Sequence, residues 1–247
     1  MFGRRGKLEA LQAEQALVII DDTVDPHVVM YHQPRGLLAE QYRALRTNIQ
    51  ALNRENVSRT ILITSSLKGE GKSLTTLNLA AAFAELEHSR ICVIDCDWRA
   101  PSIHERLSME PDVGLSELLT DRASLEEVIR PTQIRNLSVI LAGDEPENPS
   151  DLLGSERMSD LTAALKERFN YILFDTPPAA TFTDASVLAP RVDGVVFVVR
   201  LETTARKIVT DCLQRIETVG GVLLGCHLTG ARATQSDLRQ YYYSYDA

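Results

Sequence analysis

Residues Ser65 to Ser73 read Ser-Ser-Leu-Lys-Gly-Glu-Gly-Lys-Ser, and they directly follow the apolar run Thr60-Ile-Leu-Ile-Thr64. An apolar strand, a glycine-rich turn ending in Gly-Lys-Ser and a helix-forming stretch are the layout of a phosphate-binding P-loop. The glycines let backbone N–H groups approach phosphate oxygens, and the positive end of the following helix points at them. Ser66 takes the place of the first glycine of the general pattern. The expected nucleotide-binding segment is Lys68, Gly69, Glu70, Gly71, Lys72, Ser73 and Leu74.

Two side chains at the end of this motif can act on a nucleotide directly. Lys72 can reach the outer phosphates, and the hydroxyl of Ser73 can bind the Mg²⁺ ion that accompanies them. A lone Gly-Lys-Ser can also occur in an ordinary turn, so the flanking strand and helix carry the argument. The sequence therefore predicts a site for a nucleotide with Mg²⁺.

Acidic residues follow two further apolar runs. Ile91-Cys-Val-Ile94 is followed by Asp95 and Asp97. Tyr171-Ile-Leu-Phe174 is followed by Asp175, which we expect to hold Mg²⁺ directly or through water. Open α/β sheets bind ligands at the carboxyl ends of their strands, so the three carboxylates are expected to converge on the P-loop. One such Asp would more often cap a helix, but three near one P-loop favour a nucleotide site.

The order of predicted elements indicates an α/β fold of the P-loop NTPase type, with a mostly parallel sheet covered by helices on both faces. Strands are expected at 60–64, 91–94, 137–141, 171–174, 195–199 and 222–228, and the main helices at 37–52, 72–87, 151–168 and 204–218. A length of 247 residues suits a single domain. We expect an N-terminal arm at 1–36, the domain at 37–229 and a flexible tail at 230–247.

Composition narrows the class of protein. A net charge of −8 argues against general nucleic-acid binding. The four cysteines lack the paired spacing of a zinc site, and Cys92 and Cys96, on either side of a strand end, are expected to be small buried residues in a reducing compartment. No apolar run approaches the ~18 residues that a membrane-spanning helix needs, and the N-terminus lacks the apolar region of a secretory signal. A cytoplasmic location is therefore expected.

The C-terminus is rich in tyrosine. Four of the seven tyrosines fall in the last seven residues, at Tyr241, Tyr242, Tyr243 and Tyr245. A disordered tail is normally poor in aromatic residues. The tail could pack as an edge strand or bind a partner, but beside a nucleotide site a phosphorylation substrate becomes the favoured interpretation.

In combination these motifs resemble those of the bacterial tyrosine autokinases, the P-loop BY-kinases of exopolysaccharide and capsule biosynthesis. That family combines a Walker A motif with one strand ending in Asp-x-Asp-x-Arg and another ending in Asp-x-x-Pro. The matching stretches here are Gly69–Ser73, Asp95-Cys-Asp97-Trp-Arg99 and Asp175-Thr-Pro-Pro178. The resemblance covers about residues 35–247. It implies an ATP-dependent protein-tyrosine kinase that modifies its own C-terminal tyrosines in neighbouring subunits and regulates polysaccharide polymerisation and export.

The resemblance also implies roles for individual residues. The implied catalytic residues are Lys72, Asp95, Asp97 and Asp175, and the implied Mg²⁺ ligands are Ser73, Asp95 and Asp175. Asp95 would either accept the tyrosine proton or bind Mg²⁺ through water. Asp97 and Arg99 would orient the site or the neighbour's tail.

One helix carries an expected contact between subunits. Glu40, Arg43 and Arg46 match the Glu-x-x-Arg-x-x-Arg helix of the family, which implies a ring-forming interface. From spacing alone the three charges would form a solvated helix face, since such pairs stabilise a helix by only ~0.2–0.5 kcal/mol. The family also implies a separate transmembrane adaptor of the polysaccharide co-polymerase type, which would recruit the protein to the inner face of the cell membrane.

The sequence differs at two positions from related P-loop ATPases, and these differences bear on the alternative functions. Partition and cell-division ATPases carry a signature lysine where this chain has Leu67, with Lys68 one residue away. Many relatives have Asn near the adenine where Thr229 aligns here. The alternative functions are a non-kinase ATPase switch of the partition type and a nucleotide-binding scaffold.

Overall fold

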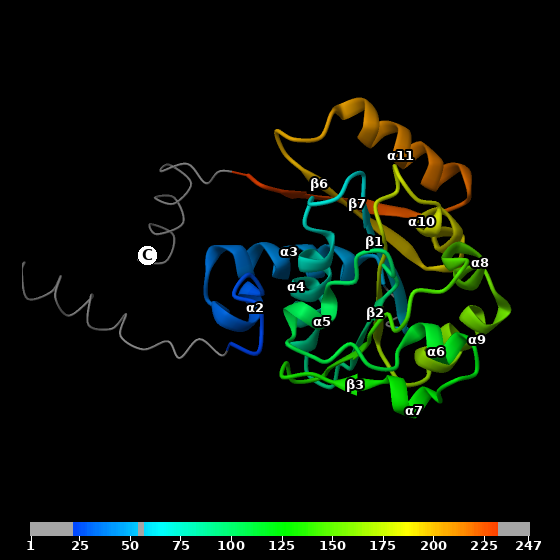
Figure 1. Ribbon diagram of the computed structural model, residues 1–247. Coiled ribbons are helices and arrows are strands. Elements are labelled where there is room, and N and C mark those ends of the chain that lie inside the picture. The colour runs from blue at the N-terminus through cyan, green and yellow to red at the C-terminus, as the bar shows by residue number, and fades with distance from the viewer. Residues whose placement is uncertain (1–21, 54–56, 232–247) are drawn as a thin grey trace, which may run out of the picture.

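The computed structural model describes residues 22–53 and 57–231, and its centre is a seven-stranded sheet in the order β3-β4-β2-β5-β1-β6-β7 (Figure 1). Neighbouring strands are parallel except for β3 and β4. The predicted fold class is therefore confirmed. The strands are β1 Arg59–Ser65, β2 Ile91–Asp95, β3 Arg130–Pro131, β4 Leu137–Ile140, β5 Tyr171–Asp175, β6 Gly194–Arg200 and β7 Leu223–Thr229.

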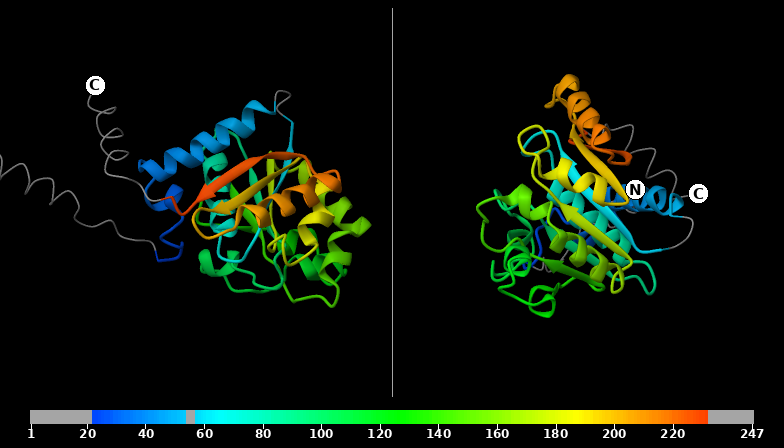
Figure 2. Two further views of the ribbon diagram at one scale, coloured as in Figure 1. Left: turned by 90° about the horizontal axis from the view of Figure 1, so that it is seen from above. Right: turned by 90° about the vertical axis from the view of Figure 1, so that its right-hand side faces the viewer.

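Helices cover both faces of the sheet, because side chains along each buried strand point alternately to opposite sides. Within β1, Ile61 and Ile63 belong to one apolar cluster and Leu62 to the other. The first face carries α2 Val29–His32, α3 Leu37–Ala51, α4 Lys72–Ala84 and α5 Ile103–Arg106. The second carries α6 Leu115–Leu119, α7 Leu125–Val128, α8 Pro149–Leu153, α9 Glu156–Lys166, α10 Asp184–Leu188 and α11 Arg206–Thr218, with a 3₁₀ turn at Ala189–Arg191. Figure 2 shows these layers from two further directions.

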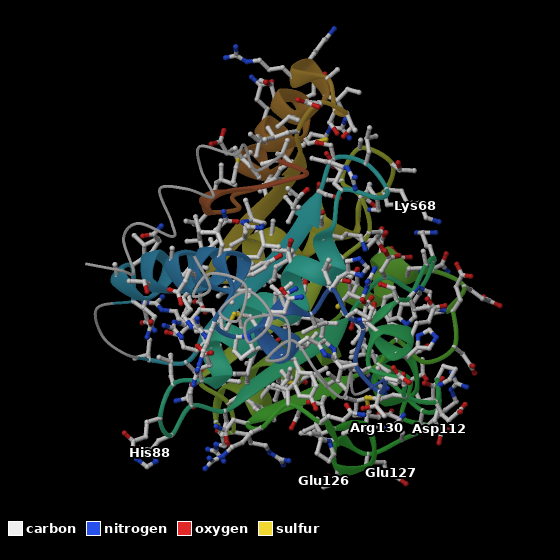
Figure 3. All side chains as sticks on the ribbon, turned by 90° about the vertical axis from the view of Figure 1, so that its left-hand side faces the viewer. Lys68, His88, Asp112, Glu126, Glu127 and Arg130 are labelled. Carbon is white, nitrogen blue, oxygen red and sulfur yellow. The ribbon has the colours of Figure 1, made fainter. Side chains whose placement is uncertain are left out.

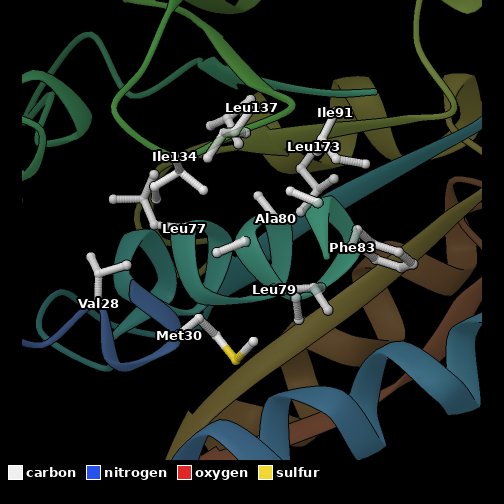
Figure 4. Packing of buried hydrophobic residues seen from close by; sticks show 14 of the residues in the cluster. Val28, Met30, Leu77, Leu79, Ala80, Phe83, Ile91, Ile134, Leu137 and Leu173 are labelled. Atoms are coloured by element: carbon white, nitrogen blue, oxygen red, sulfur yellow. The ribbon is translucent and has the colours of Figure 1, made fainter. Parts of the chain in front are cut away.

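Helix α4 is buried on nearly all sides. Leu77, Leu79, Ala80 and Phe83 are fully buried between the sheet and the layer formed by α2 and α3 (Figure 4). The ring of Phe83 also stacks on Tyr171, with the two centroids 3.9 Å apart. A helix that is apolar all round needs such a double cover. This packing fixes the direction of α4 and therefore the position of the loop that precedes it.

Several elements differ from the sequence-based prediction. The helix predicted at 151–168 is two helices, α8 and α9, which meet at Gly154 and Ser155. The hydroxyl of Ser155 accepts a hydrogen bond from the N–H of Met158. Ser155 is thus the N-cap of α9, where a new helix begins. The helix predicted at 72–87 ends at Ala84.

The structure describes only part of the expected N-terminal arm and almost none of the expected C-terminal tail. Residues 22–36, the described end of the expected arm, pack onto the domain through Val24 and Val28, both fully buried. The rest of the arm and the tail beyond residue 231 lie outside the described residues, so the proposed division of the chain stays a prediction. Within the described ranges, no helix has the length and apolarity to cross a bilayer.

Candidate functional site

The P-loop connects the carboxyl end of β1 to the first turn of α4. Gly69 and Gly71 have φ angles of 86° and 94°, in the left-handed region that favours glycine. Gly71 is also the N-cap residue of α4, directly before its first residue, Lys72. Side chains other than glycine would strain both positions, which explains why this turn needs its two glycines and why the motif was readable in the sequence.

Lys72 lies at the centre of the site. Its Nζ is 2.7 Å from Asp97 Oδ2, 3.2 Å from Ser73 Oγ and 3.8 Å from Asp175 Oδ2. Burial alone would lower the pKa of Lys72, but the carboxylates of Asp175 and Asp97 more than offset this and raise it. Lys72 therefore carries its positive charge where the sequence predicted that phosphates bind.

Asp175 is fully buried at the end of β5. The hydroxyl of Thr76 donates to its Oδ1 at 3.1 Å, whereas Oδ2 has no hydrogen-bond partner among the described residues. Burial raises the pKa of Asp175, and the nearby Lys72 and Ser73 oppose that rise. A buried carboxylate oxygen without a donor is costly, and a hard cation such as Mg²⁺ would satisfy it. Of the three predicted ligands, Ser73, Asp95 and Asp175, the first and last thus fit the ion.

Asp95 supports the loop that follows β2. Its Oδ1 accepts the N–H of Asp97 at 3.1 Å, and its Oδ2 accepts the N–H groups of Ser102 and Ile103, each at 3.2 Å. Burial and the neighbouring carboxylate of Asp175 raise the pKa of Asp95 to about 7. Parallel pairing of β2 and β5 sets Asp95 opposite Asp175, as expected for two strand ends at one edge. The predicted convergence of carboxylates on the P-loop is therefore present.

The outer P-loop residues differ in where their side chains point. Lys68 is exposed and extends outward from the molecule (Figure 3). The side chain of Glu70 is buried and turns toward β6, away from Lys72. Lys68 also lines the cavity that contains Lys72 and Ser73, whereas the Glu70 side chain is occupied by protein donors.

A cavity of about 490 Å³ opens onto the site. Its walls include Lys72, Ser73 and Asp97 on one side and Pro178 and Phe182 on the other. A second cavity of about 420 Å³ lies on the other side of the P-loop, beside Gly71 and Thr229. A larger one of about 570 Å³ lies at the far end of α4 and contains none of the predicted site residues.

The sequence did not single out Asp184, which lies close behind the first cavity. Asp184 is 1 % exposed, and neither of its carboxylate oxygens has a hydrogen-bond partner among the described residues. Its nearest cation is Arg99, 3.8 Å away, whose guanidinium lies 4.1 Å above the ring of Phe182. Asp184 opens a short helix, so in the sequence it looked like an ordinary first-turn acid.

The residues predicted to join subunits lie away from this site. Arg43 pairs with Glu40 and Glu85, and Arg46 donates to the carbonyl of Ala82 at 2.7 Å. These contacts hold α3 against the last turn of α4, at the end opposite the P-loop. The tail tyrosines lie outside the described residues.

Comparisons with known proteins agree with this arrangement. Residues 58–223 match the model of a family described as AAA domain. The chain is 32% identical to tyrosine-protein kinase YwqD of Bacillus subtilis over 87% of this chain and 91% of that protein. It is 31% identical to the putative tyrosine-protein kinase CapB of Staphylococcus aureus, over 91% and 97% respectively.

Solved structures give the same result. The kinase domain of the Escherichia coli tyrosine kinase ETK superposes with a TM-score of 0.80 at 29% identity, covering 85% of this chain and 82% of that one. The chain therefore belongs to the bacterial tyrosine-protein kinases built on a P-loop AAA domain.

Proposed function

We propose that this kinase transfers phosphate from ATP, with Mg²⁺, to the tyrosines of its own C-terminal segment in neighbouring subunits. The acceptors would be Tyr241, Tyr242, Tyr243 and Tyr245. The observation that carries the proposal is the half-buried Lys72 at the start of α4, which lies beside the carboxylates of Asp97 and Asp175 and lines a cavity. By this reaction the protein would regulate the polymerisation and export of an exopolysaccharide, as the resemblance to BY-kinases implies.

Lys72 would bind the outer phosphates of ATP. It is within 2.7 Å of Asp97, so it needs only to exchange one anionic partner for another. Bound at Ser73 and Asp175, Mg²⁺ supplies positive charge that offsets the charge on the transferring phosphoryl group. Asp97 lines the same cavity as Lys72 and Ser73.

Tyrosine hydroxyls are poor nucleophiles at neutral pH because their pKa is near ~10. We propose Asp95 as the group that accepts this proton late in the transfer, or alternatively as a ligand of Mg²⁺ through water. Its pKa of about 7 suits a proton acceptor at neutral pH. Its three backbone hydrogen bonds also keep the loop that bears Asp97 and Arg99 in place.

The test is Lys72→Met. We expect mass spectrometry to find no phosphotyrosine on this variant after incubation with ATP and Mg²⁺, because the phosphates lose their main cation. Lys207→Met is a matched control, since Lys207 is exposed on α11. Wild-type phosphotyrosine on Lys72→Met would refute the proposal, whereas ADP release by the wild type without phosphotyrosine would favour a non-kinase ATPase switch.

The proposal extends to assembly and location. Subunits would associate through Glu40, Arg43 and Arg46, and a separate transmembrane adaptor would recruit the protein to the inner face of the membrane. The exposed fraction of the Glu40 side chain, 42%, leaves it accessible to a partner subunit. Co-purification from detergent-solubilised membranes would test the adaptor: recovery of a polysaccharide co-polymerase supports it, and recovery of the kinase alone counts against it.

A further inference from the structure

Glu70 is a buried acid in a loop that otherwise faces solvent or ligand. Its side chain is 2 % exposed, and it forms no ion pair with any residue that the structure describes. Its Oε2 accepts the N–H of Leu67 at 2.6 Å. Its Oε1 accepts the N–H of Arg200 at 3.2 Å and the hydroxyl of Thr204 at 2.5 Å. One carboxylate thus joins the first turn of the P-loop to the end of β6 and to the loop before α11.

Backbone carbonyl groups of the P-loop also accept hydrogen bonds from the ends of β6 and β7. The carbonyl of Glu70 accepts the hydroxyl of Thr229, at the end of β7, at 2.6 Å. The carbonyl of Gly69 accepts Nη1 of Arg200 at 3.2 Å. Glu70, Arg200 and Thr229 all line the 420 Å³ cavity, so the P-loop and that cavity wall are one connected unit.

The energetics of a buried carboxylate make this arrangement restrictive. Removing a carboxylate from water is costly unless donors replace the lost hydration. Here the donors belong to Leu67, Arg200 and Thr204, in three separate segments. The desolvation cost of the carboxylate is therefore offset only while these segments keep their positions relative to one another. The carboxylate therefore holds the P-loop in one arrangement against the end of β6 and the loop before α11.

We propose that Glu70 is a positioning residue, which fixes the P-loop against the ends of β6 and β7 and thereby sets the affinity for nucleotide. The inference rests on the proposed ATP site. It makes affinity depend on Thr204, a residue in the loop before α11 that lines neither of the two cavities beside the P-loop. If the P-loop were held only by contacts within itself, nucleotide affinity would not depend on Thr204.

The experiment compares four variants by titration with a fluorescent ADP analogue and by thermal unfolding without nucleotide. In Glu70→Gln the amide sets an N–H against the N–H of either Leu67 or Arg200, and we expect the Kd to rise about tenfold. Thr204→Val removes one donor from a residue outside the loop and should raise the Kd about three- to tenfold. Thr204→Ser keeps the hydroxyl and should bind as the wild type does.

The double variant separates positioning from general destabilisation. If Glu70 and Thr204 act as one unit, Glu70→Gln with Thr204→Val should bind no more weakly than Glu70→Gln alone. The kcat at saturating ATP should change less than the Kd in each case. The inference would be overturned by Kd values that stay unchanged in folded variants. It would also be overturned if the losses of affinity in the two single variants add up in the double variant. If Glu70→Gln fails to fold, the comparison of Thr204→Val with Thr204→Ser decides alone. A wild-type protein that binds no nucleotide would instead contradict the proposed function.

Discussion

At the scale of single residues, the site is an excess of buried carboxylate around one ammonium group. Asp95, Asp97 and Asp175 are all at most 2 % exposed, and Lys72 is the cation that they share. Burial raises the pKa values of Asp95 and Asp175, and repulsion from neighbouring carboxylates adds to this rise. Such an arrangement costs stability and is typical of a site that takes up cations or moves protons.

The two strand-end acids should respond differently to neutralisation. Asp175→Asn removes a predicted Mg²⁺ ligand, so the Mg²⁺ concentration for half-maximal kinase activity should rise at least several-fold. Asp95→Asn should reduce kcat more than it weakens nucleotide binding. Kinase assays over a Mg²⁺ series, with exposed Asp151→Asn as the control, give both quantities. Full activity of both variants would refute this assignment of roles.

Asp184 gives a prediction on stability. Burial raises the pKa of its carboxyl, and Arg99 opposes that rise only in part. Because the folded-state pKa is raised, ionised Asp184 costs folding free energy at pH values above it, and the cost disappears as pH falls toward about 4. Asp184→Asn should therefore raise the Tm at pH 8, by about 2–4 °C for a gain of about 1 kcal/mol. Melting curves at pH 8 and pH 4 test this, and an equal or lower Tm at pH 8 would contradict it.

The sequence located most site residues because strand ends in a parallel sheet meet at one edge. Asp95 and Asp175 followed from that rule, and Lys72 followed from the P-loop motif. The partner of Lys72 was not predictable, because whether Asp97 or Asp175 lies nearer depends on the turn after β2. Glu70 and Asp184 were assigned no buried role, since their surroundings come from segments more than 80 residues away.

At the scale of elements, the contact between α3 and α4 has a bearing on assembly. Arg43 binds Glu85 through two nitrogens, Nε at 2.8 Å and Nη2 at 2.5 Å. The pairing raises the pKa of Arg43. The Glu85 side chain is 34% exposed, so the pair stabilises the fold by only ~0.2–1 kcal/mol. Such a contact is weak enough for a neighbouring subunit to compete for it.

If subunits associate through this helix as proposed, replacing Glu40, Arg43 and Arg46 together with Ala should give smaller species than the wild type while the Tm falls only slightly. Light scattering and melting curves measure both effects. Glu85→Ala is the matched control, because it breaks the same link between α3 and α4 but leaves the α3 charges in place. The interface prediction would be contradicted if the triple variant kept the wild-type mass, or if Glu85→Ala lost as much mass as the triple variant. Glu40, Arg43 and Arg46 would then be interpreted as a solvated helix face.

Element boundaries were predictable where they depend on local sequence and not where they depend on packing. The apolar runs gave β1, β2 and β5 within one or two residues. The break between α8 and α9 depends on a local signal, Gly154 followed by an N-cap serine, which the prediction overlooked. The packing of Val24 and Val28 against the domain has no local signal, because it needs the apolar surface of α4.

At the scale of the whole molecule, the proposed reaction requires the C-terminal tail of one subunit to reach the site of another. The 19 residues from Thr229 to Ala247 span at most roughly 60 Å when fully extended, enough to reach a neighbouring P-loop. Each added phosphate would bring a charge of about −1.5 to −2 to a chain that already carries −8. Repulsion from the site carboxylates should then release the modified tail and loosen the assembly.

The most direct test of the account mixes two proteins that cannot each form the product alone. One is an active chain that ends at Gln240 and lacks the tail tyrosines, and the other is full-length Lys72→Met. The account predicts phosphotyrosine at Tyr241, Tyr242, Tyr243 or Tyr245 of the inactive chain in the mixture, and none on either protein alone. Absence of phosphotyrosine in the mixture, while the wild type alone stays active at every dilution, would contradict transfer between subunits.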